Sequence, residues 1–158
     1  RIGGLLQQGK LGLEVAHGAS LGQIVRPSKQ CLRHRRVIRN IGERSGCVVT
    51  TPTGTTAYAL SAGGPIVHPT LEAVALVPIC PHTLSARPIV VSSHSRIELH
   101  LTYADDARVH FDGQHHFDLH SGDHVWITRA NRPVTLLHPH SYSYYDTLRQ
   151  KLHWGKKL

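Results

Sequence analysis

Methionine is missing from this chain of 158 residues, which begins with an arginine. We therefore expect the chain to be a fragment of a longer gene product. It also lacks any apolar run close to the roughly 18 residues that a membrane-spanning helix needs, and it lacks a secretory signal. These absences argue against a membrane partner. The length is sufficient for one domain with a hydrophobic core.

Paired cysteines are missing as well. The three cysteines, Cys31, Cys47 and Cys80, are odd in number and widely spaced. Neither a disulfide framework nor a zinc-type ligand spacing is compatible with this set. A reducing compartment suits it best, so we predict a cytoplasmic protein.

Acidic residues are scarce in the first part of the chain. Residues 1–44 contain nine Lys/Arg against two acids, a net charge of +7, whereas residues 45–158 contain nine against eight, a net charge of +1. The overall charge of +8 therefore belongs to the N-terminal segment. A basic arm of this kind binds polyanions without specificity, and we predict no specific nucleic-acid partner.

The most informative stretch runs from Thr51 to Tyr58, directly after a short β-branched run. It combines threonine hydroxyls with a proline that stiffens the turn and a glycine that allows a ligand to approach the backbone. Thr55 or Thr56 is placed to cap a short helix from Tyr58 to Ser61, which would aim free amides at a sugar or phosphate. The Tyr58 ring would then pack on a flat base. An ordinary strand-to-helix turn explains the residue types equally well, and a Walker loop is excluded because no Gly-Lys-Ser/Thr follows.

Downstream of this stretch the pattern becomes that of β-strands. Arg96–Tyr103 alternates cleanly between apolar and polar residues. Short runs recur about every ten residues, which is typical of a sandwich or jelly-roll-like core. We therefore expect a mainly β domain ending in a short helix from Ser143 to Leu152, with Tyr145, Leu148 and Leu152 on one stripe. The expected strands are 47–50, 88–91, 96–103, 108–111, 124–128 and 134–137, with a short one at 37–38 in an otherwise poorly patterned leader.

Histidine is abundant, with fourteen residues, and His115, His116, His120 and His124 are close together. Neighbouring residues of a strand point to opposite faces, so His115 and His116 cannot easily share one ion. No companion cysteine or carboxylate spacing completes a metal site. We therefore interpret these residues as surface histidines and predict no metal ligands.

Two further groups of polar residues lie outside the threonine-rich stretch. His82, Ser85 and Arg87 form a segment bounded by prolines, and a His/Ser pair is compatible with nucleophilic hydrolysis. The Gly-x-Ser-x-Gly elbow and a third partner are missing, so we do not assign this activity. Gln114 follows Asp112-Gly113, a hairpin turn signal, and its spacing alone favours an exposed hairpin glutamine.

Four blocks of the chain, in the same order, resemble those of the NAD kinase family. The fifth residue of the first block, Thr55, is usually serine in that family. The resemblance covers about residues 46–158. The blocks are 51–66, 76–88, 111–114, and 142–145 together with 151–154.

The resemblance fails upstream of residue 46. Ser45-Gly46 stands where the family has Asp-Gly, and the family's Asn-Glu or Asn-Asp pair is missing, since Asn40 is followed by Ile41. We therefore divide the chain into a basic leader at 1–45, interpreted as diverged or frameshifted, and an NAD kinase-like C-terminal domain at 46–158.

For the fold, the resemblance implies the mainly β C-terminal domain of a two-domain enzyme, with the N-terminal α/β domain absent. For the activity, it implies transfer of the terminal phosphoryl group of ATP, or of polyphosphate in some members, to the adenosine-ribose 2′-hydroxyl of NAD, giving NADP. A divalent metal, Mg²⁺, is expected with the donor. The family's catalytic Asp lies in a Gly-Gly-Asp-Gly motif that this chain does not contain. We therefore expect no catalytic residue here, and a fragment that is inactive by itself.

The resemblance also implies a set of NAD-binding residues. Gln114 is expected to reach into the pocket from the β core, and the 76–88 segment to pack against the pocket or a neighbouring subunit. A homo-oligomer, dimer or tetramer, is expected. The alternative is a catalytically inactive, truncated β module that binds NAD weakly or only oligomerises. The pocket residues are Thr56, Ala57, Tyr58, Ala59, Leu60, Ser61 and Gln114.

Overall fold

The computed structural model describes residues 46–80, 86–102, 107–130 and 135–155 in full, and residues 10–13 and 36–41 as backbone only. The predictions made for Ser45, His82 and Ser85, and for most of the leader, concern residues outside these ranges. Arg87 lies inside them and is exposed.

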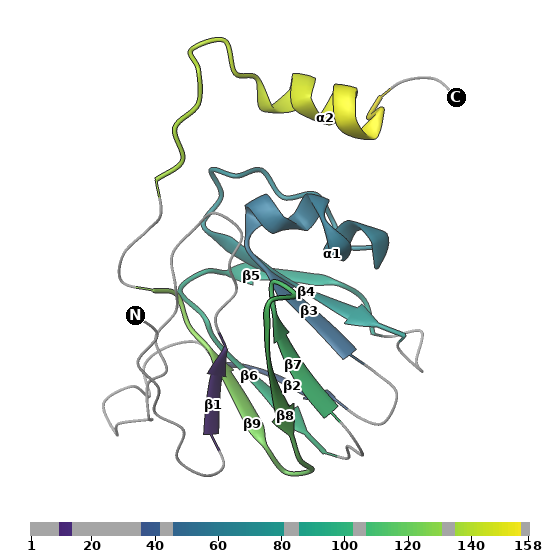
Figure 1. Ribbon diagram of the computed structural model, residues 1–158, viewed down its shortest axis with the longest axis vertical. Coiled ribbons are helices and arrows are strands. Elements are labelled where there is room, and N and C mark those ends of the chain that lie inside the picture. Colours follow the sequence, from purple (N-terminus) through teal and green to yellow (C-terminus); the bar gives the residue numbers. More distant parts are fainter. Residues whose placement is uncertain are drawn as a thin grey trace.

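The described residues form a mainly β domain of two sheets and a separate hairpin (Figure 1). The four-stranded sheet has the order β1-β9-β6-β2, and the three-stranded sheet has the order β3-β4-β5. The hairpin consists of β7 and β8. The strands are β1 (Lys10–Leu13), β2 (Arg36–Ile41), β3 (Gly46–Thr50), β4 (Ala73–Ile79), β5 (Ile89–Ser92), β6 (Arg96–Leu101), β7 (Ala107–Phe111), β8 (His115–Leu119) and β9 (His124–Ile127).

The core lies between the two sheets. Alternate residues of β6 and β9 point into it, because successive side chains of a strand face opposite sides. Leu76 and Val49, paired across β4 and β3, supply the opposite wall. Full burial of such a side chain contributes about 1.5–3 kcal/mol, so this cluster holds the two sheets together. Its other buried members are Ile97, Leu99, Leu101, Leu119, Val125 and Ile127.

Most of the expected strands are confirmed, including the short one in the leader, which is part of β2. Three strands were missed: β1, which lies in the leader, β4 and β8. β4 is a continuous apolar run, buried from Ala75 to Pro78, and therefore shows no alternation. β8 is polar and histidine-rich because it pairs only with β7. The strand expected at 134–137 is wrong for residues 135–137, which belong to no strand, and Leu137 is 91% exposed.

The C-terminal helix α2 runs from Tyr144 to Leu152 and confirms the predicted helix. It begins where the Ser143 hydroxyl accepts a hydrogen bond of 3.2 Å from the backbone N–H of Asp146, an N-cap that satisfies a free amide. Of the expected apolar stripe only Leu148 is buried, whereas Tyr145 is 51% exposed. The helix lies beyond the short helix α1 (Tyr58–Ser61), as seen from the core of the domain (Figure 1). Within the described ranges no helix has the length and apolar character needed to cross a membrane.

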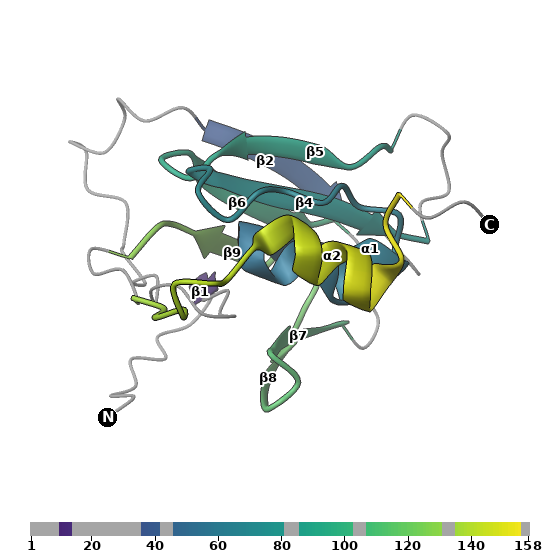
Figure 2. The same ribbon diagram turned by 90° about the horizontal axis from the view of Figure 1, so that it is seen from above.

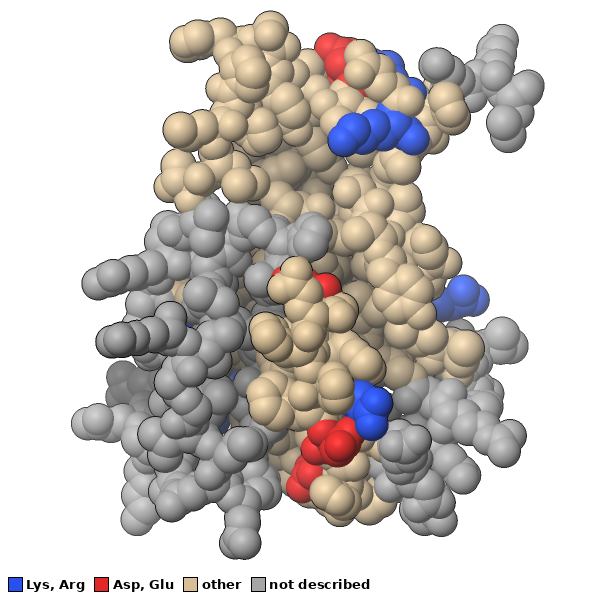
Figure 3. All heavy atoms as spheres, in the orientation of Figure 1, with Lys and Arg blue, Asp and Glu red and all other residues tan. Residues whose placement is uncertain are grey.

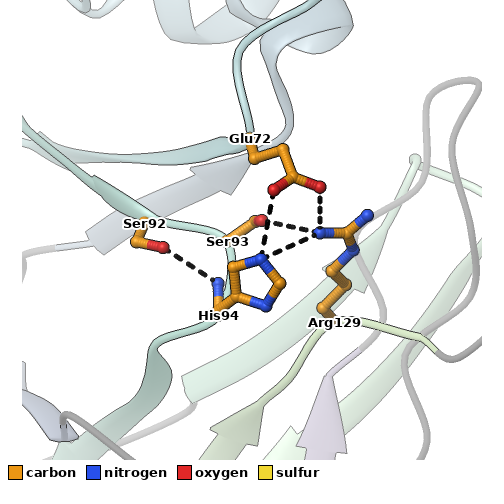
Figure 4. A network of polar contacts seen from close by, with 5 residues as sticks. All are labelled: Glu72, Ser92, Ser93, His94 and Arg129. Carbon is orange, nitrogen blue, oxygen red and sulfur yellow. Dashed lines mark hydrogen bonds and ion pairs between the residues drawn. The ribbon is translucent and has the colours of Figure 1, made fainter.

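An exposed ionic cluster fastens the two sheets to each other (Figure 4). Glu72, just before β4, accepts a 2.6 Å hydrogen bond from Arg129, which follows β9. The other carboxylate oxygen of Glu72 lies 3.2 Å from His94 in the β5–β6 turn, and Arg129 also donates to Ser93. The hydrogen bond from Arg129, followed by that from His94, lowers the pKa of Glu72 below its usual value of 4.5.

We expect the Glu72→Gln variant to have a lower melting temperature than the wild type at pH 6 to 7. Because the folded-state pKa of Glu72 is depressed, its stabilisation is complete above the unfolded value of 4.5 and disappears as the pH falls through the folded value. The difference in melting temperature should therefore shrink below pH 4.5. A double-mutant cycle with Arg129→Gln is the control, since the second substitution should add little to the first. A difference independent of pH would contradict the assignment.

Mixed charge is typical of the described surface. On the face shown in Figure 3, basic and acidic side chains lie beside each other rather than in a patch of one sign. Two exposed ion pairs join side chains of opposite sign: Arg108 with Asp118 on the hairpin, at 2.7 Å, and Arg149 with Asp146 on α2, at 2.8 Å. The hydrogen bond from Arg108 lowers the pKa of Asp118.

Candidate functional site

The threonine-rich stretch forms a compact double turn at the end of β3. A 3-10 helix covers Pro52–Thr56, with the proline in its first turn, where a missing N–H costs nothing. Gly54 donates to the Thr51 carbonyl at 3.0 Å and accepts from the Ala57 N–H at 3.1 Å. Ala57 then turns the chain into α1, with φ −98° and ψ −133°. The loop thus ends with α1 packed through Ala59 against β4, the central strand of the three-stranded sheet.

The threonine hydroxyls bond within the loop. The side chain of Thr55 is fully buried, and its hydroxyl donates to the Pro52 carbonyl at 2.6 Å and accepts from the Val67 N–H at 3.1 Å. The Thr56 hydroxyl donates to the Thr53 carbonyl at 3.4 Å. The prediction that Thr55 or Thr56 caps α1 is therefore wrong. The residue before the helix is Ala57, without a side-chain cap, because the hydroxyls are already used by the 3-10 turn.

The six loop residues predicted to line the pocket divide into outward and inward positions. Ala57, Tyr58 and Ser61 are exposed, with 63% of Tyr58 open to solvent. Thr56 and Leu60 are half-buried. Ala59 is 1% exposed and packs with Ala75 and Val77 of β4 in a second small core cluster. The loop therefore presents an aromatic ring and a hydroxyl on a surface anchored to the sheet.

Gly64 allows α1 to lie close to β4. Its N–H donates to the Ala59 carbonyl at 2.8 Å, which closes the turn after the helix. A Cβ at this position would lie 2.7 Å from the Ala59 carbonyl oxygen and 2.7 Å from a methyl group of Val77. Only glycine therefore permits this approach of helix to strand.

Gln114 lies at the tip of the β7–β8 hairpin, as expected from the turn signal. Asp112 and Gly113 have φ values of 47° and 71°, the left-handed region in which glycine is favoured and Asp is tolerated. The Gln114 N–H donates to the Phe111 carbonyl at 2.9 Å, and the residue is exposed. Figure 2 shows the hairpin projecting from the two sheets.

The clustered histidines occupy different environments. His115 pairs with Phe111 and His116 with His110, so these two neighbours lie on opposite faces of the hairpin, as predicted. His124 is the one of these four histidines that is half-buried. Its ring lies 2.7 Å from the carboxylate of the buried Glu98, because both residues are on neighbouring strands of the four-stranded sheet. In the ranges given above, no three His, Cys, Asp or Glu side chains are grouped to hold a metal ion.

One cluster near the loop was not anticipated. The His68 ring contacts Tyr144 edge-on at 4.9 Å between centroids and Tyr145 at 5.6 Å. The Tyr144 hydroxyl donates a long, 3.5 Å hydrogen bond to the Val67 carbonyl. Burial, with smaller contributions from Tyr142 and Tyr145, raises the pKa of Tyr144, so this hydroxyl remains a donor at neutral pH. The tyrosine-rich block was visible in the sequence, but its partner was not.

The sequence matches the family described as ATP-NAD kinase C-terminal domain over residues 19–138. It is 96% identical over 113 residues to the NAD kinase of Thiobacillus denitrificans, a match that covers 72% of this chain and 39% of that protein. It is 47% identical over 154 residues to the NAD kinase of Laribacter hongkongensis, covering 93% of this chain and 53% of that protein. The chain thus spans about two fifths to one half of the length of these relatives.

The fold has a counterpart of known structure. Yeast NADH kinase complexed with NADH superposes with a TM-score of 0.54, at 24% sequence identity, over 71% of this chain and 36% of the yeast protein. At this level of identity the likeness concerns the fold, a mainly β domain. The family match over most of the sequence shows that the chain belongs to the NAD kinase family and corresponds to its C-terminal domain.

Proposed function

We propose that this chain is part of an NAD kinase and supplies residues that bind NAD. The parent enzyme would transfer a phosphoryl group to the adenosine-ribose 2′-hydroxyl of NAD and produce NADP. The observation that carries the proposal is the exposed, anchored loop from Thr56 to Ser61 in a chain that belongs to this family. ATP is the proposed donor, in line with the family's description, with polyphosphate as a second candidate.

The loop residues have distinct roles in this proposal. The exposed ring of Tyr58 offers a face for a nucleotide base, and Ser61 offers a hydroxyl to the ribose. Ala59 packs against β4, so it would shape the pocket through its backbone. Gln114 offers both a donor and an acceptor from the tip of the hairpin.

Phosphoryl transfer depends on positioning and on stabilisation of charge rather than on covalent chemistry by the protein. The described residues contain no carboxylate group arranged for a metal, so we assign Mg²⁺ to no residue of this chain. We likewise assign no catalytic base here, and propose that this chain alone is inactive. Its task would be to hold NAD with the 2′-hydroxyl oriented for transfer.

The competing hypothesis is a catalytically inactive β module that binds NAD weakly or only oligomerises. The high identity to proteins named NAD kinase favours the enzyme over this module. We propose a cytoplasmic location, since the three cysteines of the sequence, Cys31, Cys47 and Cys80, are odd in number and widely spaced, a set that suits a reducing compartment. We also propose a homo-oligomeric parent enzyme, a dimer or tetramer.

We expect the substitution Tyr58→Ala to weaken NAD binding about tenfold, since stacking on an aromatic side chain contributes about 1–3 kcal/mol per base. Calorimetry with NAD on this chain measures the binding. Kinetics of the Thiobacillus denitrificans NAD kinase with the equivalent change should show a raised KM for NAD. Tyr142→Ala, another exposed tyrosine, is the matched control and should change neither value. An unchanged KM in the Tyr58 variant would exclude this tyrosine from the NAD pocket.

A further inference from the structure

Thr55 is the most deeply buried polar residue of the described chain, at 0% exposure. Its hydroxyl makes two hydrogen bonds with different consequences. The first, to the Pro52 carbonyl at 2.6 Å, closes the 3-10 turn. The second, from the Val67 N–H at 3.1 Å, joins this turn to a segment twelve residues away. Thr55 is thus both part of the loop and the point where the loop is attached to its surroundings.

Residues 67 and 68 connect this attachment point to the C-terminal helix. Val67 is 6% exposed, donates its N–H to Thr55 and accepts the long hydrogen bond from the Tyr144 hydroxyl. The neighbouring His68 ring lies against Tyr144 and Tyr145 of α2. One short segment is therefore held by the loop on one side and by α2 on the other, and both views show α2 lying over α1 (Figures 1 and 2).

The Thr55 hydroxyl is bonded close to the point where the chain changes direction. Thr55 is the last residue but one of the 3-10 turn, two positions before the change of direction at Ala57, and Tyr58 begins α1 directly after it. Loss of the hydroxyl would leave the Val67 N–H without this partner in a buried place, which is unfavourable for a backbone donor. The 3-10 turn would also lose one of the bonds that fix its shape. The ring of Tyr58 and the backbone of Ala57 would then sample other orientations.

We propose that Thr55 is a positioning residue for the NAD-binding loop, and that helix α2 holds it in place through Val67 and His68. This inference rests on the proposed function, because it concerns the same loop. It assigns no contact with NAD to Thr55 itself. It predicts that docking of α2 and binding of NAD stabilise each other, since a coupling free energy between two sites is reciprocal.

The first experiment compares Thr55→Val with Thr55→Ser by calorimetry with NAD. Valine keeps the shape of threonine but removes the hydroxyl, so we expect NAD affinity to fall about fivefold to tenfold, in line with the cost of an unpaired buried N–H. Serine keeps the hydroxyl and should restore affinity to within about twofold of the wild type. In the Thiobacillus denitrificans NAD kinase the equivalent Thr55→Val change should raise the KM for NAD more than it lowers kcat. Equal affinity of the wild type and the valine variant would overturn the proposal.

The second experiment acts on α2, away from the loop, and remains decisive if Thr55→Val fails to fold. The double substitution Tyr144→Ala and Tyr145→Ala removes the contacts with His68 and should weaken NAD binding severalfold. Tyr142→Ala is the matched control, because its ring stacks on His138 at 3.9 Å instead. In the wild type, NAD should slow amide hydrogen exchange in residues 144–152. Unchanged affinity in the double variant, or unchanged exchange, would refute the coupling.

The two levels of the proposal fail in different ways. A wild-type chain and a parent enzyme that both fail to bind NAD would refute the proposed function and this inference with it. A wild type that binds NAD, together with valine and double-tyrosine variants that bind it equally well, would refute the inference alone. A loss of binding in Thr55→Ser comparable to that in Thr55→Val would also overturn it, since the hydroxyl would then not be the feature that matters.

Discussion

Replacing Gly64 with alanine is expected to destabilise the domain by about 3 kcal/mol, the upper end for overpacking a core. The new methyl group would lie 2.7 Å from the Ala59 carbonyl oxygen and equally close to a methyl group of Val77. Neither can move cheaply, because Ala59 and Val77 are both buried and belong to one cluster. The carbonyl also accepts the Gly64 N–H at 2.8 Å, so relief of the clash would break the bond that ends α1.

Urea unfolding followed by circular dichroism measures this loss as a lower midpoint at constant slope. Gly46→Ala is the matched control. A Cβ there would meet only the Ile79 side chain at 3.6 Å, an ordinary contact, so its effect should stay within about 1 kcal/mol. We also expect the Gly64 variant to bind NAD more weakly, because α1 carries Tyr58. Equal midpoints for the two alanine variants would show that α1 is not seated against β4 as described.

Leu76→Ala is expected to cost about 2–5 kcal/mol, the range for removal of a large buried aliphatic side chain. Leu76 is 1% exposed and lies on β4, the central strand of the three-stranded sheet. It belongs to the cluster between the two sheets, which includes Val49 beside it and Ile97 on β6. The cavity would open where the sheets meet, and strands paired on both sides have little freedom to close it.

The measurement is again the urea midpoint, supported by the melting temperature. Leu137→Ala provides the control with the same chemistry on the surface: Leu137 is 91% exposed, so the change should stay within about 0.5 kcal/mol. If the two leucine variants proved equally stable, the core between the sheets would be placed wrongly.

The alternation of apolar and polar residues, together with turn residues, was sufficient to predict strands whose apolar side chains all lie on one face. β6 was predicted correctly because its apolar residues Ile97, Leu99 and Leu101 alternate with polar ones, although Glu98 on the other face is buried too. The hairpin turn at Asp112-Gly113 was also visible, since few residues accept its left-handed backbone. β4 was missed for the opposite reason: a strand buried on both faces has no period of two. β8 was missed because most of its residues are exposed on a two-stranded hairpin, so it lacks the apolar alternation of a core strand.

The candidate loop was located by its residue types, but its internal bonding was not. A threonine just before a short helix commonly acts as its N-cap. The neighbouring sequence gives no sign that a backbone N–H twelve residues away donates to the same hydroxyl. That N–H belongs to Val67, which follows the turn at Gly63 and Gly64. For the same reason the contact between His68 and the tyrosines of α2 could not be read from the chain, since more than seventy residues separate the partners.

By itself, the sequence determined the family, the mainly β class and the stretch that we propose binds NAD. These depend on local features: residue spacing, turn chemistry and a distinctive order of motifs. Only the tertiary structure showed that the Thr55 hydroxyl is buried and that Gly64 is packed between the end of α1 and β4. It also decided that α2 rests on the segment that Thr55 holds. The physical reason is that a hydroxyl or a Cβ position acquires its role from whichever atoms the fold brings within about 3 Å of it.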